Sequence, residues 1–118
     1  MGKAGVYLVR NGDLHKIGRT ENLQRRLEQL RPGVLVQWLE TDRSRDLEYE
    51  LHQRFKEKRI PQTEYFRLDE REVSQARSAL GWIEPPIAFQ NISGPVREVK
   101  NGVLKELDPE TGYWKTVS

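Results

Sequence analysis

The apolar residues of this chain first suit strands and then take up a helical spacing. Val6 and Leu8, and Ile17 after a turn, supply side chains that favour extended structure. Between them, residues 11–13 (Asn-Gly-Asp) tolerate the positive φ that a tight hairpin requires. The pattern therefore predicts two antiparallel strands within residues 5–20.

Three later stretches repeat their apolar residues at intervals of three and four, as a helix with one buried face does. Residues 31–33 (Arg-Pro-Gly) end the first predicted helix, and Ile60-Pro61 follows the second, which we expect to run to about residue 58. The apolar positions of the three helices are Leu23, Leu27 and Leu30, then Leu47, Leu51 and Phe55, and finally Val73, Ala76 and Leu80.

Residues with short polar side chains precede each predicted helix and are placed to cap it. Thr20 precedes the first helix, and Thr41 or Asp42 precedes the second. Asp69, with Glu72 three residues later, forms a capping-box start for the third. Each helix therefore has a local start signal.

The sheet is completed by residues 34–39, which are nearly all apolar and predict a third, central strand. Residues 62–68 resemble a loop that leads into a further short strand. Three antiparallel strands covered by helices make a stable unit. We therefore expect an α+β fold, with a three-stranded antiparallel sheet flanked by helices in a first domain of residues 1–82.

The end of the chain has a different pattern. Residues 96–107 place Asn101-Gly102 between two short strands, which is a strong hairpin signal, and residues 113–117 add a third strand. We expect residues 83–118 to form a small C-terminal β-hairpin or meander, joined to the first domain through the stiff Glu84-Pro85-Pro86. So short a unit buries little surface alone, so it should pack on the first domain or on a partner chain.

Composition limits the function classes. The 118 residues contain no cysteine, which excludes disulfides, thiol nucleophiles and cysteine-ligated zinc. No apolar run has the length of a membrane span, and the N-terminus lacks the apolar region of a signal peptide. We therefore expect an intracellular (cytoplasmic) protein that makes no contact with a membrane.

Charge is small overall but unevenly distributed. Residues 1–68 carry 14 Lys and Arg against 10 Asp and Glu, a net +4, whereas residues 69–118 carry 6 against 8, a net −2. A basic surplus in the first part suits a polyanionic partner, although the same surplus occurs in domains that bind no nucleic acid.

Two charged side chains lie at the margins of the predicted buried helix faces. Glu48 borders the apolar stripe of the second helix, so its carboxylate should be half withdrawn from water and face the sheet. Arg26 flanks the apolar face of the first helix, whereas Arg25 points away from it. From the residues alone, a solvated helix acid at Glu48 and a structural ion pair at Arg26 remain alternatives.

Two short motifs carry a resemblance to a known family. Gly5-Val6-Tyr7 and Lys16-Ile17-Gly18, with Arg26 eight residues after the second glycine, resemble the core of the GIY-YIG nuclease family. The similarity is to a phage and bacterial subgroup whose second motif is Lys-Ile-Gly. In that motif the lysine, here Lys16, stands where most members have a tyrosine. It covers roughly residues 5–68. The asparagine with which the family usually ends its core is missing, and Glu64-Tyr65-Phe66 occupies that region.

The resemblance implies a catalytic role for each of four residues. Glu48 would be the sole protein ligand of Mg²⁺ or Mn²⁺, and Arg26 would neutralise charge on the scissile phosphate. Tyr7 would be the general base, with Lys16 positioning or activating the nucleophile. A cationic Lys16 beside Tyr7 would help a phenol to act as a base near neutral pH. An ordinary strand aromatic at Tyr7 is the alternative.

The same resemblance suggests secondary contacts. Arg19, Arg25 and Arg67 would contact nucleic acid, Arg19 as a phosphate ligand at the start of a helix. His52, one turn after Glu48, would be a partner of that carboxylate or a proton carrier. DNA is the favoured substrate over RNA. A homodimer would enlarge the small surface available for reading sequence.

Three functions fit these observations. The first is a metal-dependent endonuclease that hydrolyses nucleic-acid phosphodiester bonds. The second is a nucleic-acid-binding module of the same fold with little or no cleavage, which the altered second motif favours. The third is an interaction domain with no nucleic-acid role, which would require the basic residues to be scattered over the surface. The aromatic and basic residues of the C-terminal unit could touch DNA, or the aromatics could form the core of that unit.

Overall fold

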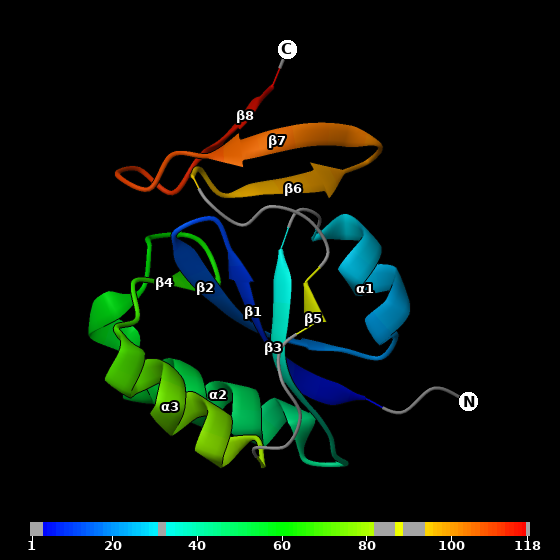
Figure 1. Ribbon diagram of the computed structural model, residues 1–118, viewed down its shortest axis with the longest axis vertical. Helices are drawn as coiled ribbons and strands as arrows, with labels where there is room; N and C mark the ends of the chain where they lie inside the picture. The colour runs from blue at the N-terminus through cyan, green and yellow to red at the C-terminus, as the bar shows by residue number, and fades with distance from the viewer. Residues whose placement is uncertain (1–3, 31–32, 82–86, 89–93, 118) are drawn as a thin grey trace.

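A computed structural model of the protein describes residues 4–30, 33–81, 87–88 and 94–117. Within them, five strands form a first sheet in the spatial order β4-β2-β1-β3-β5, and every neighbouring pair is antiparallel (Figure 1). The strands are β1 (Gly5–Asn11), β2 (Leu14–Thr20), β3 (Val34–Glu40), β4 (Tyr65–Phe66) and β5 (Ile87–Ala88).

The prediction of an α+β fold with an antiparallel sheet flanked by helices is confirmed, but two details of the sheet were wrong. The described sheet has five strands, because the two-residue strands β4 and β5 extend it at either edge. The central strand is β1, whereas β3 was expected to be central. Residues 34–39 are mostly apolar because helices cover both faces of β3. This apolar pattern does not indicate where β3 lies in the strand order of the sheet.

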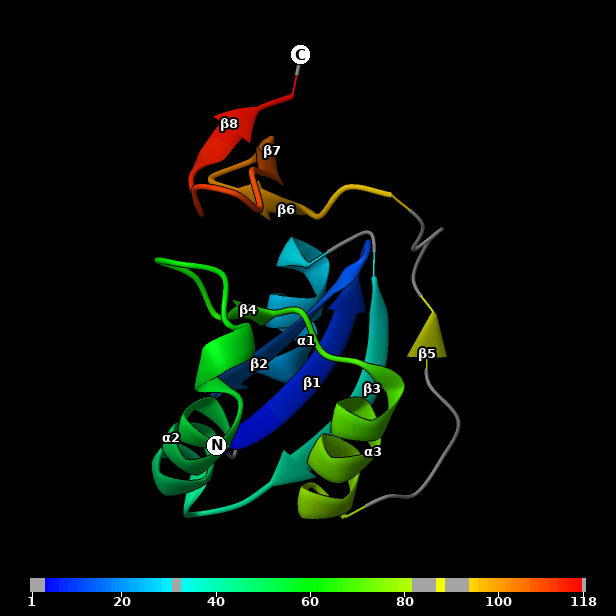
Figure 2. The ribbon, with the colours of Figure 1, turned by 90° about the vertical axis from the view of Figure 1, so that its left-hand side faces the viewer.

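Helices cover both faces of this sheet (Figures 1 and 2). Alternate strand residues such as Val6 and Leu8 pack against α2 and α3 on one face, while Tyr7 and Val9 pack on the side of α1. The helices are α1 (Leu23–Gln29), α2 (Ser44–Arg54) and α3 (Glu70–Ala79), with a 3₁₀ turn, η1 (Lys56–Lys58), after α2.

Helix boundaries agree with the sequence only in part. The capping box is confirmed: the Asp69 side chain accepts from the Glu72 amide, and the Glu72 carboxylate accepts from the Asp69 amide. The Thr20 cap was wrong, because Thr20 is the last residue of β2 and Asn22 caps α1. The second cap was also wrong, because Arg43 stands at the start of α2 and makes no side-chain cap.

The second sheet matches the expected meander. Its strands are ordered β6-β7-β8, and Asn101-Gly102 forms the β6–β7 turn with φ of 54° and 77°, the left-handed conformation that this pair favours. The strands are β6 (Arg97–Lys100), β7 (Val103–Leu107) and β8 (Trp114–Thr116).

The second sheet packs on the first across the β1–β2 turn and β4. Leu14 and Tyr65 of the first sheet share one buried cluster with Val96, Leu107 and Trp114 of the second. This sheet therefore lies against the same chain. The expected boundary at residues 82–86 lies outside the described residues, and the division into domains 1–82 and 83–118 stays a prediction.

Candidate active site

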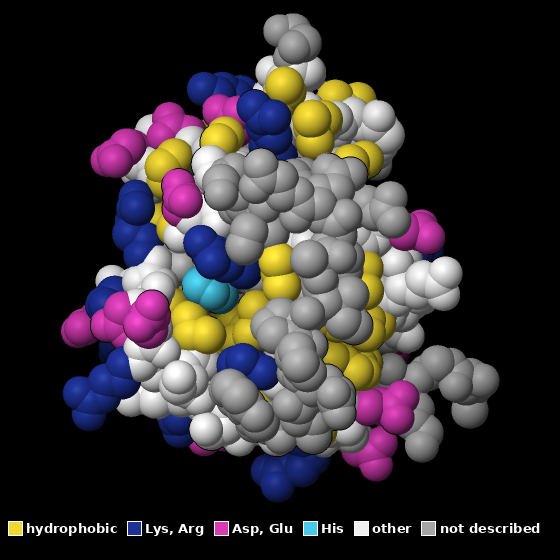
Figure 3. Space-filling model, viewed as in Figure 1, with side chains coloured by type: hydrophobic (Ala, Val, Ile, Leu, Met, Phe, Trp, Pro, Cys, Tyr) yellow, Lys and Arg dark blue, Asp and Glu magenta, His cyan; other side chains and the backbone are white. Residues whose placement is uncertain are grey.

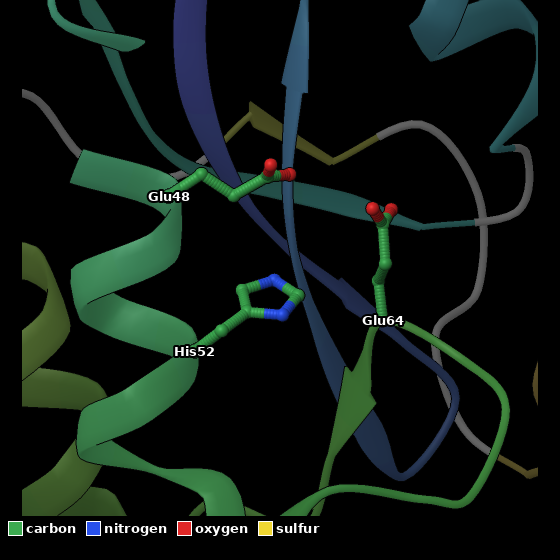
Figure 4. A group of neighbouring side chains, drawn as sticks. All are labelled: Glu48, His52 and Glu64. Carbon is green, nitrogen blue, oxygen red and sulfur yellow. The ribbon is translucent and has the colours of Figure 1, made fainter. Parts of the chain in front are cut away.

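Three side chains that could ligate a metal meet at the edge of β2 (Figure 4). Glu48 and His52 lie one turn apart on α2, and Glu64 lies in the segment that leads into β4. One ligand atom from each lies within 4.8 Å of the others, and all three side chains are half-buried. The cluster exists because β4 pairs with β2 only at His15 and Lys16, which leaves the rest of that edge to α2.

The backbone of Ile17 fixes two members of this cluster. His52 Nε2 lies 2.7 Å from the carbonyl oxygen of Ile17, and the Ile17 amide donates to the carbonyl of Glu64 at 3.2 Å. Because a carbonyl only accepts, Nε2 carries the proton. The His52 ring also meets Phe66 edge to face, with ring centroids 4.9 Å apart. His52 and Glu64 are therefore held at the same point of β2.

Glu48 is an acid whose surroundings only partly compensate its charge. Burial raises the pKa of the Glu48 carboxyl, and the charge of Glu64 raises it further. The charges of His52 and Arg19, with a hydrogen bond from the Arg19 amide, oppose this rise. None of the ion pairs within the described part of the chain includes Glu48 or Glu64.

This donor set fits a hard divalent cation. Two neighbouring carboxylates without a lysine or arginine partner repel each other, and an ion of charge +2 between them would relieve that repulsion. Carboxylate oxygens are the ligands that suit Mg²⁺ and Mn²⁺. Because Nε2 of His52 donates to Ile17, the ligand atoms left free are Nδ1 of His52 and the oxygens of Glu48 and Glu64. The geometry thus adds Glu64 to the single ligand expected from sequence.

Tyr7 lies beside this cluster with its hydroxyl buried and unpaired. The side chain is fully buried in β1, and its oxygen has no hydrogen-bond partner among the described residues. A Cβ on Gly18, opposite Tyr7 on β2, would lie 2.3 Å from that oxygen. The absence of a side chain at Gly18 is therefore what allows the phenol to lie across β2.

The charges around Tyr7 show which groups share its environment. Burial raises the pKa of the Tyr7 phenol well above its usual range. The charge of Arg26 opposes the rise, and those of Glu64, Glu98 and Glu48 add to it. The structure thus brings Tyr7, Arg26 and Glu48 near one another, as the sequence suggested. The phenol, however, keeps its proton more firmly than free tyrosine does.

Lys16 does not serve Tyr7 as expected from sequence. Its Nζ lies 2.7 Å from Oε2 of Glu98 on β6, and the two side chains are almost fully buried. Lys16 is not among the charges that shift the pKa of Tyr7; the cation that lowers it is Arg26. The expectation that Lys16 makes the Tyr7 phenol more acidic was therefore wrong, because the ammonium charge is matched by Glu98.

A comparison with family models identifies the chain's relatives. The model of the T5orf172 domain matches residues 4–82, which is well over half of the 118-residue chain. The chain belongs to the T5orf172 domain family. That family is associated with nuclease and nucleic-acid-binding proteins. No curated protein and no solved structure matches this chain.

The T5orf172 match overturns the resemblance inferred from Gly5-Val6-Tyr7 and Lys16-Ile17-Gly18. The family model that matches is a different one, so the assignment to the GIY-YIG family was wrong. Short motifs of three residues, two of them apolar or glycine in each case, are shared by unrelated hairpins and specify a family weakly. The roles given to individual residues now depend on their geometry alone.

The three arginines expected to contact nucleic acid have different surroundings in this T5orf172 domain. Arg19 is half-buried, and its Nε donates to Ser44 Oγ at the start of α2, 2.8 Å away. Arg25 is exposed and, with Arg26, lines a surface hollow of about 260 Å³ beside α1. Arg67 is exposed and reaches the second sheet, where it donates to the Pro109 carbonyl at 3.5 Å. Of these three arginines, only Arg25 lines the same hollow as Arg26.

The surface and the helices of this T5orf172 domain show how its charges are spread. On the face drawn in Figure 3, the basic and acidic side chains of the described residues are interspersed. Among those residues, no helix is long and apolar enough to cross a bilayer. The hollow beside α1 is lined by Arg25 and by Arg26, whose charge acts on Tyr7.

Sequence reasoning missed two acids of the site. Glu64 was noted only as part of a replaced motif, although a strand that pairs at Lys16 and Tyr65 places residue 64 opposite Ile17. Glu98 gave no signal, because its partners are 82 and 33 residues away in the chain. The first could have been found from the β2–β4 register, and the second only from the docked second sheet.

Proposed function

We propose that this T5orf172 domain protein is a metal-dependent endonuclease that hydrolyses phosphodiester bonds of DNA, with Mg²⁺ or Mn²⁺ as its cation. The observation that carries the proposal is a pair of carboxylates without an ion-pair partner among the described residues, Glu48 and Glu64, beside the buried, unpaired hydroxyl of Tyr7. A fold that withdraws two acids from water without pairing them loses stability, unless a ligand supplies the missing charge.

The carboxylates of Glu48 and Glu64 would hold the cation, and His52 would keep the edge of β2 in place through its bond to Ile17. When bound, the cation polarises the phosphoryl oxygen as a Lewis acid and lowers the pKa of water. Deprotonated carboxylates are required for this, so protonation of Glu48 at low pH opposes metal binding.

Arg26 is the phosphate ligand in this proposal. Its guanidinium is always charged and forked, so it can bind two phosphate oxygens at once. It is half-buried, lies close enough to Tyr7 to act on its pKa, and lines the same hollow as Arg25. Arg25, which is exposed, would bind the neighbouring phosphate of the backbone.

Tyr7 would orient the attacking water. Because its pKa is raised, the phenol remains protonated near neutral pH, and it can both donate and accept a hydrogen bond. Its oxygen has no partner among the described residues but is fully buried, so a water or a phosphate oxygen would reach it only after the side chains around it move. Lys16 shares the same face of the hairpin, two residues along β2 from Gly18, the partner of Tyr7, and would stabilise negative charge on the phosphate.

The decisive experiment is cleavage of plasmid, single-stranded and branched DNA, and of matched RNA, with Mg²⁺ or Mn²⁺. We expect Glu48→Gln to lower the rate by about 100-fold or more, because the cation loses a ligand. Glu50→Gln is the matched control: Glu50 lies on the same helix, but is exposed and at the limit of an ion pair with Arg54. Equal rates for wild type and Glu48→Gln would reject the site.

The second candidate is a nucleic-acid-binding module without cleavage. Two observations favour it: the Lys16 charge is matched by Glu98, and the pKa of Tyr7 is raised. Salt-sensitive DNA binding by wild type and by Glu48→Gln, with no cutting by either protein, would establish it. The homodimer stays a prediction, and sedimentation of the DNA-free protein is the measurement that would test it.

A further inference from the structure

The buried carboxylate of Glu98, in the second sheet, packs against the face of the first sheet on which Tyr7 lies. Glu98, on β6, is 2% exposed, and a single oxygen of its carboxylate accepts two strong hydrogen bonds. Lys16 Nζ donates to Oε2 at 2.7 Å, and the Tyr65 hydroxyl donates to the same atom at 2.6 Å. Lys16 and Tyr65 face each other in the β2–β4 register, so this oxygen joins two strands of the first sheet.

The backbone around Glu98 is fixed independently of its charge. The side-chain amide of the fully buried Asn11 accepts from the amide of Arg97 at 3.2 Å and donates to the Arg97 carbonyl. It thereby imitates a strand residue paired with β6. Asn11 Nδ2 also donates a hydrogen bond to the Tyr65 hydroxyl at 2.9 Å, and this bond orients the phenol toward Glu98.

The shared apolar cluster of Leu14, Tyr65, Val96 and Leu107 also holds the two sheets together. Docking therefore does not require an ion pair. Replacing a buried pair with apolar side chains of similar size is often neutral or stabilising. The presence of a charged pair where an apolar one would serve is the feature to explain.

We propose that Glu98 is a positioning residue of the active site: it holds the Lys16 ammonium in place on the Tyr7 side of the first sheet. On this proposal the second sheet, which lies outside the matched T5orf172 segment, is part of the active site. The proposal rests on the nuclease activity proposed above for its effect on rate, but the contact itself is tested without cleavage.

Several polar and charged groups surround the Lys16–Glu98 pair. From the described elements, Lys16 of β2, Tyr65 of β4 and Lys100 of β6 face the Glu98 carboxylate, with Lys100 Nζ at 3.8 Å. Tyr7 of β1 feels the Glu98 charge. On α1, which packs against β6, Arg26 faces Tyr7. Without the Glu98 charge, the buried Lys16 ammonium has no anionic partner among the described residues.

The test compares Glu98→Gln with the matched control Glu106→Gln. Glu106 also lies in the second sheet and pairs with Arg97 and Lys115, but it has no ion pair to the first sheet among the described residues. We expect Glu98→Gln to lower kcat about tenfold or more with little change in KM, because the lost interaction matters in the transition state. Glu106→Gln should match wild type.

A second variant keeps the experiment decisive if Glu98→Gln does not fold. Glu98→Asp retains the charge but shortens the reach, so kcat should fall. Unchanged kcat in Glu98→Gln would mean that Glu98 is a structural contact only. Faster cleavage would mean that Glu98 restrains Lys16. Both results would overturn the proposal.

An NMR measurement separates this proposal from the proposed function. In ¹⁵N-lysine-labelled wild-type protein we expect a slowly exchanging ammonium signal of Lys16, assigned by its loss in Lys16→Gln. The signal should be lost or strongly shifted in Glu98→Gln and retained in Glu106→Gln. If wild type cuts no substrate but this pattern is found, the nuclease proposal fails while the hold of Glu98 on Lys16 stands. An unchanged Lys16 signal in Glu98→Gln rejects the hold itself.

Discussion

Glu48 and Glu98 are both acids withdrawn from water near the same tyrosine, yet their surroundings are opposite. Glu98 is almost completely buried, and its carboxylate is saturated by an ammonium and a phenol. Glu48 is half-buried, has a raised pKa and has another acid, Glu64, as its neighbour. The Glu98 carboxylate has its hydrogen-bond and ion-pair partners within the fold, whereas the Glu48 carboxylate is placed to bind a ligand from outside the chain.

This difference distinguishes an acid that positions other side chains from acids that are placed to bind a ligand. A buried charge that is fully paired fixes the position of its partners. An acid placed beside another acid destabilises the native state at neutral pH, and it is retained only where a ligand benefits. The contrast between Glu98 and the Glu48–Glu64 pair therefore predicts opposite responses to substitution.

The largest expected effect is the loss of stability on removing one half of the buried pair. Glu98→Ala should lower the free energy of unfolding by about 3–5 kcal/mol, because the Lys16 ammonium is left buried and unpaired. The double variant Lys16→Met with Glu98→Met should recover most of that loss. Glu106→Gln, which breaks partly exposed pairs, should lower it by less than about 1 kcal/mol. Urea unfolding measures all three, and equal losses for Glu98→Ala and Glu106→Gln would contradict the assignment.

A third withdrawn group, His15, sharpens the comparison because it is neither paired nor a candidate ligand. Burial first, and the charge of Arg10 second, lower its pKa to about 4 from 6.5. The unfolded chain therefore binds a proton at a higher pH than the native state, and stability falls as the pH drops from about 6.5 to about 4. The loss is at most about 3 kcal/mol. His15→Gln should unfold with a smaller pH dependence across this window in urea melts; parallel curves would contradict the lowered pKa.

The smallest expected effect concerns metal affinity at the Glu48–Glu64 pair. Glu48→Gln and Glu64→Gln should each weaken Mn²⁺ binding by about 10- to 100-fold in calorimetry, with Glu50→Gln unchanged. Because the pKa of Glu48 is raised above 4.5, Mn²⁺ affinity should begin to fall at a higher pH than for an ordinary glutamate site. If Mn²⁺ affinity falls in Glu48→Gln but not in Glu64→Gln, Glu48 is the single protein ligand and Glu64 does not bind the cation.

Much of the fold could be predicted because its signals are local. The Asp69–Glu72 capping box and the Asn101-Gly102 turn each depend on residues within one turn of the chain, and both are confirmed. The strand order was not predictable, because β4 and β5 are two-residue strands that exist only through pairing with β2 and β3. The α1 cap was placed two residues early because Thr20 and Asn22 are both capping residues, and β2 extends as far as Thr20.

The candidate site was predictable only where one element carries the information. Glu48 and Arg26 were singled out from their positions on helix faces, and the structure brings both near Tyr7. Glu64 and Glu98 come from segments whose neighbours are set by tertiary packing. The pKa of Tyr7 depends on burial among all of these groups, so helix and strand patterns could not give even its direction.

The contact between Tyr7 and Gly18 has a consequence for how such chains vary. The phenol oxygen lies where a side chain of Gly18 would begin, so the volume at this point of the hairpin can be used by only one of the two strands. A larger residue at Gly18 is therefore compatible only with a smaller one at Tyr7, which would remove the hydroxyl. The two positions form one steric unit, and a search for distant relatives that retain this site should require both together.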